Sequence, residues 1–176
     1  MALDIETAAA VARTIGLDEH GLHVDTVPGG DIAEASVLSA SDATVFVKTL
    51  PLAQAGLLSA EQDGLEALAR AGSVRTPRVI QRGMIDGVAW LALEYLDLDA
   101  RSARADAALG EQLAALHRHG NDEFGWHRNN YIGRTPQSNT RDSDWTTFFA
   151  IQRLDRQFDR QRDFQVEKGG GKYRRR

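Results

Sequence analysis

The sequence predicts an α+β protein in which a five-stranded, mostly antiparallel sheet with one embedded helix is followed by a helical unit. Runs rich in β-branched residues and punctuated by glycine turns fill residues 22–50 and return between 78 and 96. A leucine pattern of helical spacing separates these two groups of strands, and helical spacing dominates again after residue 97. Strands, helix, strands and then helices are the element order of such a fold.

The first strands follow a short helix. Residues 4–15 are rich in Ala, Val and Ile, and Gly16 is placed to end the helix. Three strands joined by tight turns are expected at 22–28, 32–40 and 43–49. In the third, Val45 and Val47 point to one face, and four side chains share the other: Thr44, Phe46, Lys48 and Leu50.

The middle of the chain supplies the embedded helix and the last two strands. A helix is expected from about residue 57 to 71, after Pro51 has ended the third strand. Its apolar stripe consists of Leu58, Leu65 and Leu68. Strands are expected at 78–83 and 88–96, joined by a hairpin turn at Asp86-Gly87.

The C-terminal part is predicted to be helical around one long loop. A helix over 102–117 carries Leu109, Leu113 and Leu116, and a polar loop occupies 120–142. A last helix begins at the cap signal Asp142-Ser143-Asp144 and carries Trp145, Phe148, Ile151 and Phe158. The predicted division is therefore into residues 1–97, residues 98–162 and a disordered basic tail, 163–176.

Composition excludes several classes of protein. The 176 residues include no cysteine, which excludes disulfide scaffolds, cysteine-ligated metals and thiol nucleophiles. Charged residues interrupt the N-terminus, and no stretch is long and apolar enough to span a membrane, so a cytoplasmic protein is expected. Residues 154–176 carry a net charge of +4 and the rest −8. Because acids dilute this basic tail, specific nucleic-acid binding is not expected.

Lys48 and Glu61 form the first candidate site. A lone strand lysine is typical of an edge strand with a solvated amine, and a glutamate beside a leucine stripe commonly reaches water. Both residues, however, point toward the same interior, where buried charges need partners. A strand lysine paired with a carboxylate on the following helix is how kinases orient nucleotide phosphates.

Two other segments are compatible with a nucleotide site. Gly29-Gly30, between the first two strands, would let backbone N–H groups approach a phosphate, although two such glycines are also typical of an ordinary hairpin. The run 91–96 leads out of the sheet and would offer backbone groups to an adenine edge, or is simply a buried strand end.

With these residues, the chain resembles the fructosamine (ketosamine) kinase family, within the fold shared by aminoglycoside phosphotransferases and protein kinases. The resemblance covers roughly residues 5–157. Its most specific part is Asn130-Tyr131-Ile132-Gly133 with Thr135-Pro136-Gln137 and Asn139. Further matching segments are Gly29-Gly30-Asp31-Ile32, Phe46-Val47-Lys48, Glu61 through Leu68, Leu93-Glu94, residues 109–117, Phe124-Gly125-Trp126, Trp145, Phe148, Arg153-Leu154 and Gln157.

The resemblance implies a protein-kinase-like N-lobe, an incomplete helical C-lobe and a role for each candidate residue. Lys48 and Glu61 would orient the phosphates of ATP, which Gly29 and Gly30 would cover. The adenine would contact the segment Glu94, Tyr95 and Leu96. The loop 124–139 would lie on the side of the sugar-amine substrate, with four residues as candidates: Trp126, Asn130, Gln137 and Asn139. The implied substrates are glycated amines or proteins.

Two parts that the resemblance requires are missing. The sequence holds no His-Gly-Asp catalytic loop, so no catalytic residue is assigned, and no later aspartate for Mg²⁺, which the family would use with ATP. His119-Gly120-Asn121-Asp122 and Asp163-Phe164-Gln165 resemble these motifs only by coincidence. No carboxylate or cysteine completes a convincing ligand set with His117, His119 and His127, so no metal site is predicted.

Three functions remain open at this stage. The first is an ATP-dependent kinase of sugar-derived hydroxyls on glycated amines, with this chain truncated and inactive alone. The second is a non-catalytic module that binds a nucleotide or another protein. The third is a non-functional gene fragment, in which four aromatic residues would lack their cover: Trp145, Phe148, Phe149 and Phe158. The sequence does not indicate the oligomeric state.

Overall fold

The structure is a computed structural model that describes residues 3–41, 43–98, 100 and 102–158. It divides into two compact units, Met1–His119 and Gly120–Arg176, and each is described by itself. The predicted boundary lies between residues 97 and 98, ahead of the helix over 103–117 that the structure groups with the first unit. The predicted disordered tail, 163–176, lies outside the described residues.

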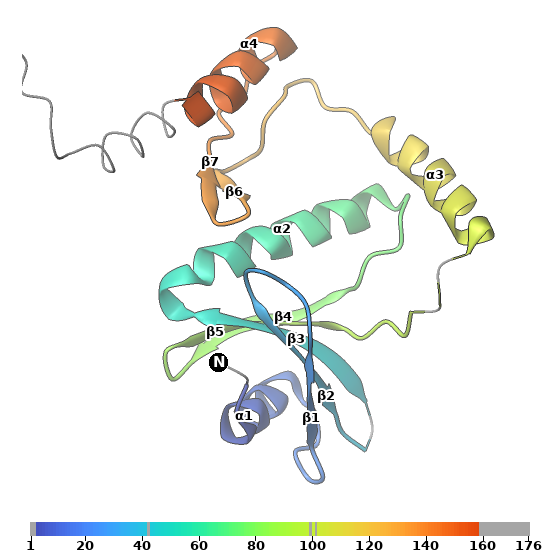
Figure 1. The fold of residues 1–176 in the computed structure, drawn as a ribbon, viewed down its shortest axis with the longest axis vertical. Helices are drawn as coiled ribbons and strands as arrows, with labels where there is room; N and C mark the ends of the chain where they lie inside the picture. The colour runs from blue at the N-terminus through green and yellow to red at the C-terminus, as the bar shows by residue number, and fades with distance from the viewer. Residues whose placement is uncertain (1–2, 42, 99, 101, 159–176) are drawn as a thin grey trace, which may run out of the picture. The chain divides into compact units, whose positions relative to one another are not determined.

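The first unit is built on a five-stranded sheet in which every neighbouring pair of strands is antiparallel (Figure 1). The strands are β1 (His23–Val27), β2 (Glu34–Ser39), β3 (Thr44–Pro51), β4 (Val79–Ile85) and β5 (Val88–Glu94). Their order across the sheet is β1-β2-β3-β5-β4, so β3 and β5 are central and β1 and β4 are edges. The predicted α+β fold with an antiparallel five-stranded sheet is confirmed, and Pro51 is the last residue of β3.

Helix α1 (Ile5–Ile15) covers one face of the sheet. The Asp4 carboxylate accepts a hydrogen bond from the Thr7 N–H and begins the helix, while Gly16 ends it with a φ of 79°. The core on this side joins small and branched side chains of the helix to the sheet: Ala8, Val11 and Ala12 with Leu38, Val45, Val47, Trp90 and Ala92. Val45 and Val47 thus lie on the face predicted by alternation.

Helix α2 (Ala55–Ala71) covers the opposite face. A short 3₁₀ turn, Leu52–Gln54, leads into it, and Gly72 ends it. Leu58 is 1% exposed and packs with the sheet residues Leu50, Ala89, Leu91 and Leu93. A hydrogen bond of 2.9 Å from Arg82 Nε on β4 to Gln62 Oε1 also ties the helix to the sheet. These contacts fix the height and rotation of α2 above β3.

Helix α3 (Ala103–His117) begins at Ser102, whose hydroxyl accepts a hydrogen bond from the Ala105 N–H. None of its residues is buried, and Leu109 and Leu113 remain 45% and 39% exposed. The sequence therefore predicts this helix correctly, but its leucine pattern is not buried in the first unit. In the described part of the chain, no helix combines the length and the apolar character needed to span a membrane.

The second unit contains a hairpin where the sequence predicts only a loop. Strands β6 (Asn130–Ile132) and β7 (Thr135–Gln137) pair as antiparallel neighbours within the predicted loop 120–142. Their turn uses Gly133, which has a φ of 60°. The interpretation as an unbroken loop was wrong because these strands have only three residues each, bury none of them fully and include a proline, so no apolar alternation marks them in the sequence.

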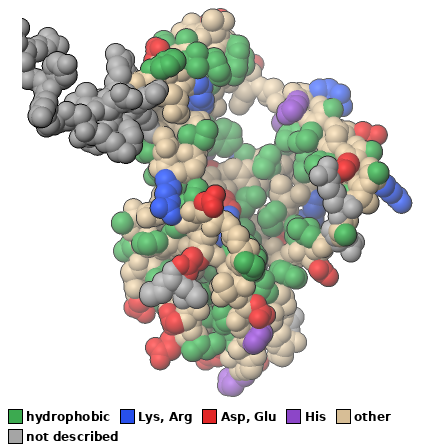
Figure 2. Space-filling model, in the orientation of Figure 1, with side chains coloured by type: hydrophobic (Ala, Val, Ile, Leu, Met, Phe, Trp, Pro, Cys, Tyr) green, Lys and Arg blue, Asp and Glu red, His purple; other side chains and the backbone are tan. Residues whose placement is uncertain are grey.

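Towards the end of the described residues lies helix α4 (Trp145–Phe149), which continues through a wider π-helical segment, Ala150–Asp155. Asp144 accepts a hydrogen bond of 2.7 Å from the Thr147 N–H, as the cap signal predicts. Figure 2 shows hydrophobic side chains gathered over this part of the chain, and Trp145, Phe149 and Phe158 are all at least 40% exposed. Phe148, which would lack cover under the hypothesis of a gene fragment, is buried, at 4% exposed.

Candidate functional site

The candidate site begins with an ion pair between β3 and α2. Lys48 Nζ lies 2.6 Å from Glu61 Oε1, and both side chains are about 30% exposed, at 29% and 31%. Lys48 stands between Ala35 of β2 and Leu91 of β5, so its stem rises from the apolar core under α2. The two charges can lie beside an apolar core because each is the other's partner. Nearly a third of each side chain remains accessible to a ligand.

The register of the sheet places the glycine turn directly beyond Lys48. Val27, the last residue of β1, pairs with Ala35, which pairs in turn with Lys48. The turn between β1 and β2 therefore extends from the same row of residues that carries the lysine. Gly29 and Gly30 have φ values of 105° and 106°, a conformation that side chains with a Cβ rarely adopt. This turn thus depends on glycine and keeps its backbone open to a ligand.

The segment predicted to contact adenine lies on the other side of the Lys48 row. Along β5, Glu94 is three residues beyond Leu91, the strand partner of Lys48, which corresponds to roughly 10 Å. Lys48 is therefore between the glycine turn and the exit of β5. Tyr95, 41% exposed, and the half-buried Leu96 follow the strand and continue out of the sheet.

The Glu94 side chain itself faces away from Lys48. Glu94 pairs with Val45, which belongs to the α1 side, whereas Lys48 and Leu91 belong to the α2 side. Its carboxylate accepts hydrogen bonds from Arg75 Nη2 at 2.6 Å and from the Arg78 N–H at 3.0 Å. These hydrogen bonds, with that from Arg75 the stronger, lower the pKa of Glu94. Glu94 could therefore contact adenine through its backbone and not through its side chain.

In the second unit, Asn139 is the buried centre of a hydrogen-bond network, called here the hub. It is 3% exposed, and its Nδ2 donates to Asn130 Oδ1 at 2.7 Å and to the Arg128 carbonyl at 3.1 Å. Its N–H donates to Asn129 Oδ1 at 2.9 Å. We predicted Asn130 and Asn139 on the substrate side, and the structure brings them together, with their amides hydrogen-bonded to each other.

Arg153 completes this hub from the helical end of the unit. Its guanidinium donates to Asn139 Oδ1 at 2.8 Å and to the Ser138 carbonyl at 2.7 Å, and it stacks over the Phe148 ring at 4.6 Å. Burial lowers its pKa. The π-helical segment that contains Arg153 is a feature often found at functional sites. Arg153 is among the residues that carry the family resemblance, but its sequence context predicts no role for it.

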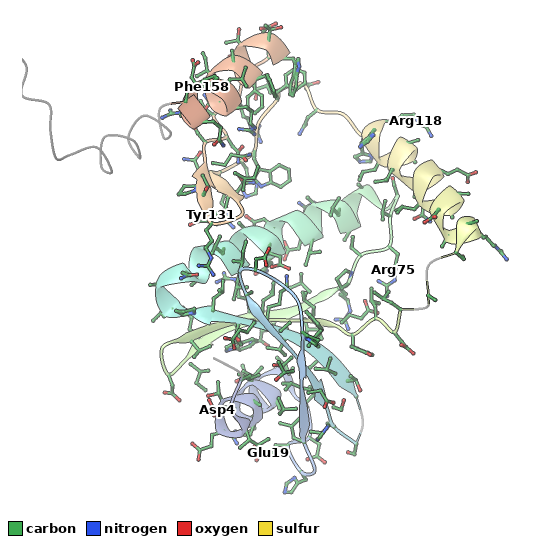
Figure 3. All side chains as sticks on the ribbon, in the orientation of Figure 1. Asp4, Glu19, Arg75, Arg118, Tyr131 and Phe158 are labelled. Atoms are coloured by element: carbon green, nitrogen blue, oxygen red, sulfur yellow. The ribbon has the colours of Figure 1, made fainter. Side chains whose placement is uncertain are left out.

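The other two predicted substrate-side residues flank this hub. Trp126 is half-buried, its backbone N–H donates to the Asn139 carbonyl at 3.2 Å, and its ring centroid lies 5.2 Å from that of His127. Gln137 is the strand partner of Asn130 at the base of the β6–β7 hairpin. Tyr131 lies on the hairpin, 38% exposed (Figure 3). The hub thus fixes the backbone that presents these side chains.

Neither a catalytic loop nor a metal centre is assigned. Among the described residues, no group of three or more His, Cys, Asp or Glu side chains is arranged to hold a metal ion. His119 ends the first unit, and the segment Asp163-Phe164-Gln165 lies outside the described residues.

Relatives of known sequence are named as kinases of ketoamines. The chain is 38% identical over 148 residues to a probable ketoamine kinase of Synechocystis, a match that covers 84% of this chain and 50% of the relative. It is 34% identical over 143 residues to a chloroplastic protein-ribulosamine 3-kinase of Arabidopsis thaliana, covering 80% of this chain and 44% of that protein. The chain therefore spans about half the length of these relatives.

Solved structures show the same fold. A crystal structure of a protein assigned as a fructosamine-3-kinase from Haemophilus somnus superposes with a TM-score of 0.75 at 26% identity, over 90% of this chain and 53% of that one. The corresponding protein of Thermobifida fusca gives a TM-score of 0.72 at 31% identity, over 89% of this chain and 55% of its own length. The kinase-like fold class is thereby confirmed.

A sequence model described as fructosamine kinase matches residues 5–173. This range corrects one expectation, because the resemblance was predicted to end near residue 157 and instead extends into the basic tail. Matched over nearly its whole length, the chain belongs to the fructosamine kinase family.

Proposed function

We propose that the protein takes part in ATP-dependent phosphorylation of ketoamines, and that the first unit of this chain is its nucleotide-binding part. In the reaction, the γ-phosphoryl group of ATP passes to a hydroxyl oxygen of the sugar-derived part of a glycated amine or protein, and ADP leaves. The names of the relatives, ketoamine kinase and protein-ribulosamine 3-kinase, support this substrate class.

The observation that carries the proposal is the linear order of three features on the sheet. The exit of β5, the Lys48–Glu61 ion pair and the Gly29-Gly30 turn follow one another along the strand direction. This order matches an extended nucleotide, in which the base lies at one end and the phosphates at the other. The base would meet the backbone of residues 94–96, and the lysine and the glycine turn would meet the phosphates.

ATP would be bound as its magnesium complex, and no residue of this chain is assigned to the metal. We further propose that the 176-residue chain alone binds nucleotide without transferring the phosphoryl group, since its sequence contains no His-Gly-Asp catalytic loop. A non-catalytic nucleotide-binding module is the second candidate function, and the same sequence observation favours it.

A binding assay and a turnover assay separate these functions. The purified chain is titrated with a fluorescent ADP analogue in the presence of Mg²⁺, and ADP release from ATP is measured with a ketoamine such as a fructosyl-amine. If the chain binds the analogue and Lys48→Ala weakens this binding strongly, the result supports the nucleotide site. Arg70→Ala, on the exposed end of α2, is the control. Turnover that Lys48→Ala abolishes would show that the chain is catalytic alone. A folded chain that binds no nucleotide would contradict the proposal.

A further inference from the structure

The segment between α2 and β4 holds the exit of β5 at several points. Figure 3 shows Arg75 where this segment runs beside the chain that leaves β5. Arg75 Nη2 donates to Glu94 Oε1 at 2.6 Å, and the Arg78 N–H donates to Glu94 Oε2 at 3.0 Å. In return, the Glu94 N–H donates to the Arg78 carbonyl at 2.8 Å. Both carboxylate oxygens and the backbone of Glu94 are therefore engaged by one short segment.

Arg75 is itself oriented for this contact. Its second terminal nitrogen, Nη1, donates to the Thr76 carbonyl at 2.7 Å, so the guanidinium is fixed on one side while it binds the carboxylate on the other. An arginine fork held at two points loses less freedom on binding than a lysine would. An exposed ion pair alone contributes little to global stability, and the Arg75 side chain is 62% exposed. Its effect is thus local, at the point where β5 ends.

The face on which this contact occurs determines what it can do. Glu94 points to the α1 side of the sheet, whereas Lys48 and Glu61 lie on the α2 side. Arg75 therefore holds the backbone from behind and leaves the ligand side clear. In the part of the chain that the structure describes, the strand pairs of β5 end at Glu94, so Tyr95 and Leu96 depend on this anchor for their position.

We propose that Arg75 is a positioning residue for the base of the nucleotide: by binding Glu94 it fixes the backbone of residues 94–96 against which the adenine is held. This inference rests on the proposed nucleotide site and deepens it. Two residues on opposite faces of the sheet then have different roles. Lys48 acts on the phosphates, and Arg75 acts on the base through Glu94. Arg75 touches no part of the nucleotide.

The test compares a probe that has a base with one that has none. The full 176-residue chain is titrated with a fluorescent ADP analogue and, in competition, with inorganic tripolyphosphate. Arg75→Ala is expected to weaken the ADP analogue about five- to tenfold, the value of one net hydrogen bond, while tripolyphosphate binding changes less than about twofold. Arg75→Lys and Glu94→Gln are expected to lie between wild type and Arg75→Ala.

Two controls make the result specific. Lys48→Ala is expected to weaken both probes, and Arg70→Ala, which removes an exposed charge from the end of α2, neither. Equal binding of the ADP analogue by wild type and Arg75→Ala would overturn the inference, and so would equal weakening of both probes by Arg75→Ala. A folded wild-type chain that binds neither probe would instead refute the proposed nucleotide site, and the inference with it.

Discussion

Gly83 and Trp90 form a cross-strand pair whose packing allows a quantitative prediction. They stand opposite each other on β4 and β5, and the Trp90 ring lies over the glycine in the core on the α1 side. A Cβ added at Gly83 would be 2.7 Å from Trp90 Cε2 and closer still to Cζ2, well inside the 3.4 Å at which ordinary contact begins. The change Gly83→Ala therefore forces the ring to move.

The expected loss of stability depends on how little space the Trp90 ring has to move. Trp90 is 2% exposed, so it cannot rotate into solvent, and overpacking of this kind costs about 1–3 kcal/mol. The substitution also restricts the unfolded chain, which stabilises the folded state by about 0.4–1 kcal/mol. We expect the free energy of unfolding to fall by about 1–2 kcal/mol. For a chain of this size each kcal/mol lowers the melting temperature by about 2–4 °C.

Urea denaturation and thermal melting followed by far-UV circular dichroism measure this loss. The matched control is Gly64→Ala in α2, where an added Cβ meets no atom within 4 Å. This control is expected to raise stability by about 0.5–1 kcal/mol, because alanine is the better helix former. The reasoning fails if Gly83→Ala is as stable as wild type, or if both substitutions shift the midpoint in the same direction.

Three further predictions concern the core, the hub and a helix cap. Leu58→Ala, at a side chain 1% exposed, is expected to cost about 2–5 kcal/mol in urea denaturation, and a smaller loss would mean that α2 collapses onto the sheet. Asn139→Ala leaves the Arg153 guanidinium without one acceptor and is expected to destabilise the second unit by about 1–3 kcal/mol, seen as faster amide exchange across residues 128–139. The Thr147 N–H lowers the pKa of Asp144, so the cap stabilises α4 above about pH 4 and is lost as the pH falls through the lowered value. Asp144→Asn is expected to flatten this acid-induced loss of helicity, and an unchanged titration would contradict the assignment.

The sheet and its two covering helices could be predicted because local patterns and burial agree there. Alternation along β3 separates Val45 and Val47 from Phe46 and Lys48, and the structure buries the two valines against α1. The same alternation, with the helical spacing of Leu58 and Glu61, was enough to bring the lysine and the carboxylate together.

Long-range polar contacts could not be predicted in this way. Nothing local distinguishes Arg75 from other exposed arginines, because its partner Glu94 lies 19 residues away. Arg153, within the π-helical segment, reaches Asn139 across 14 residues, a separation that no local pattern indicates. Likewise, no feature of the sequence shows that Asn139 is buried and holds the backbone of the loop through its hydrogen bonds.

The strand order has a mechanical consequence for ligand binding. The glycine turn joins β2 to the edge strand β1, which has hydrogen-bonded neighbours on one side only, whereas Lys48 is on the central strand β3. Edge strands open at a lower free-energy cost than central ones. The turn can therefore bend to fit ligands of different length while the Lys48–Glu61 ion pair keeps its geometry. The positions of β1 and β3 in one sheet thus combine a flexible glycine turn with a rigid ion pair.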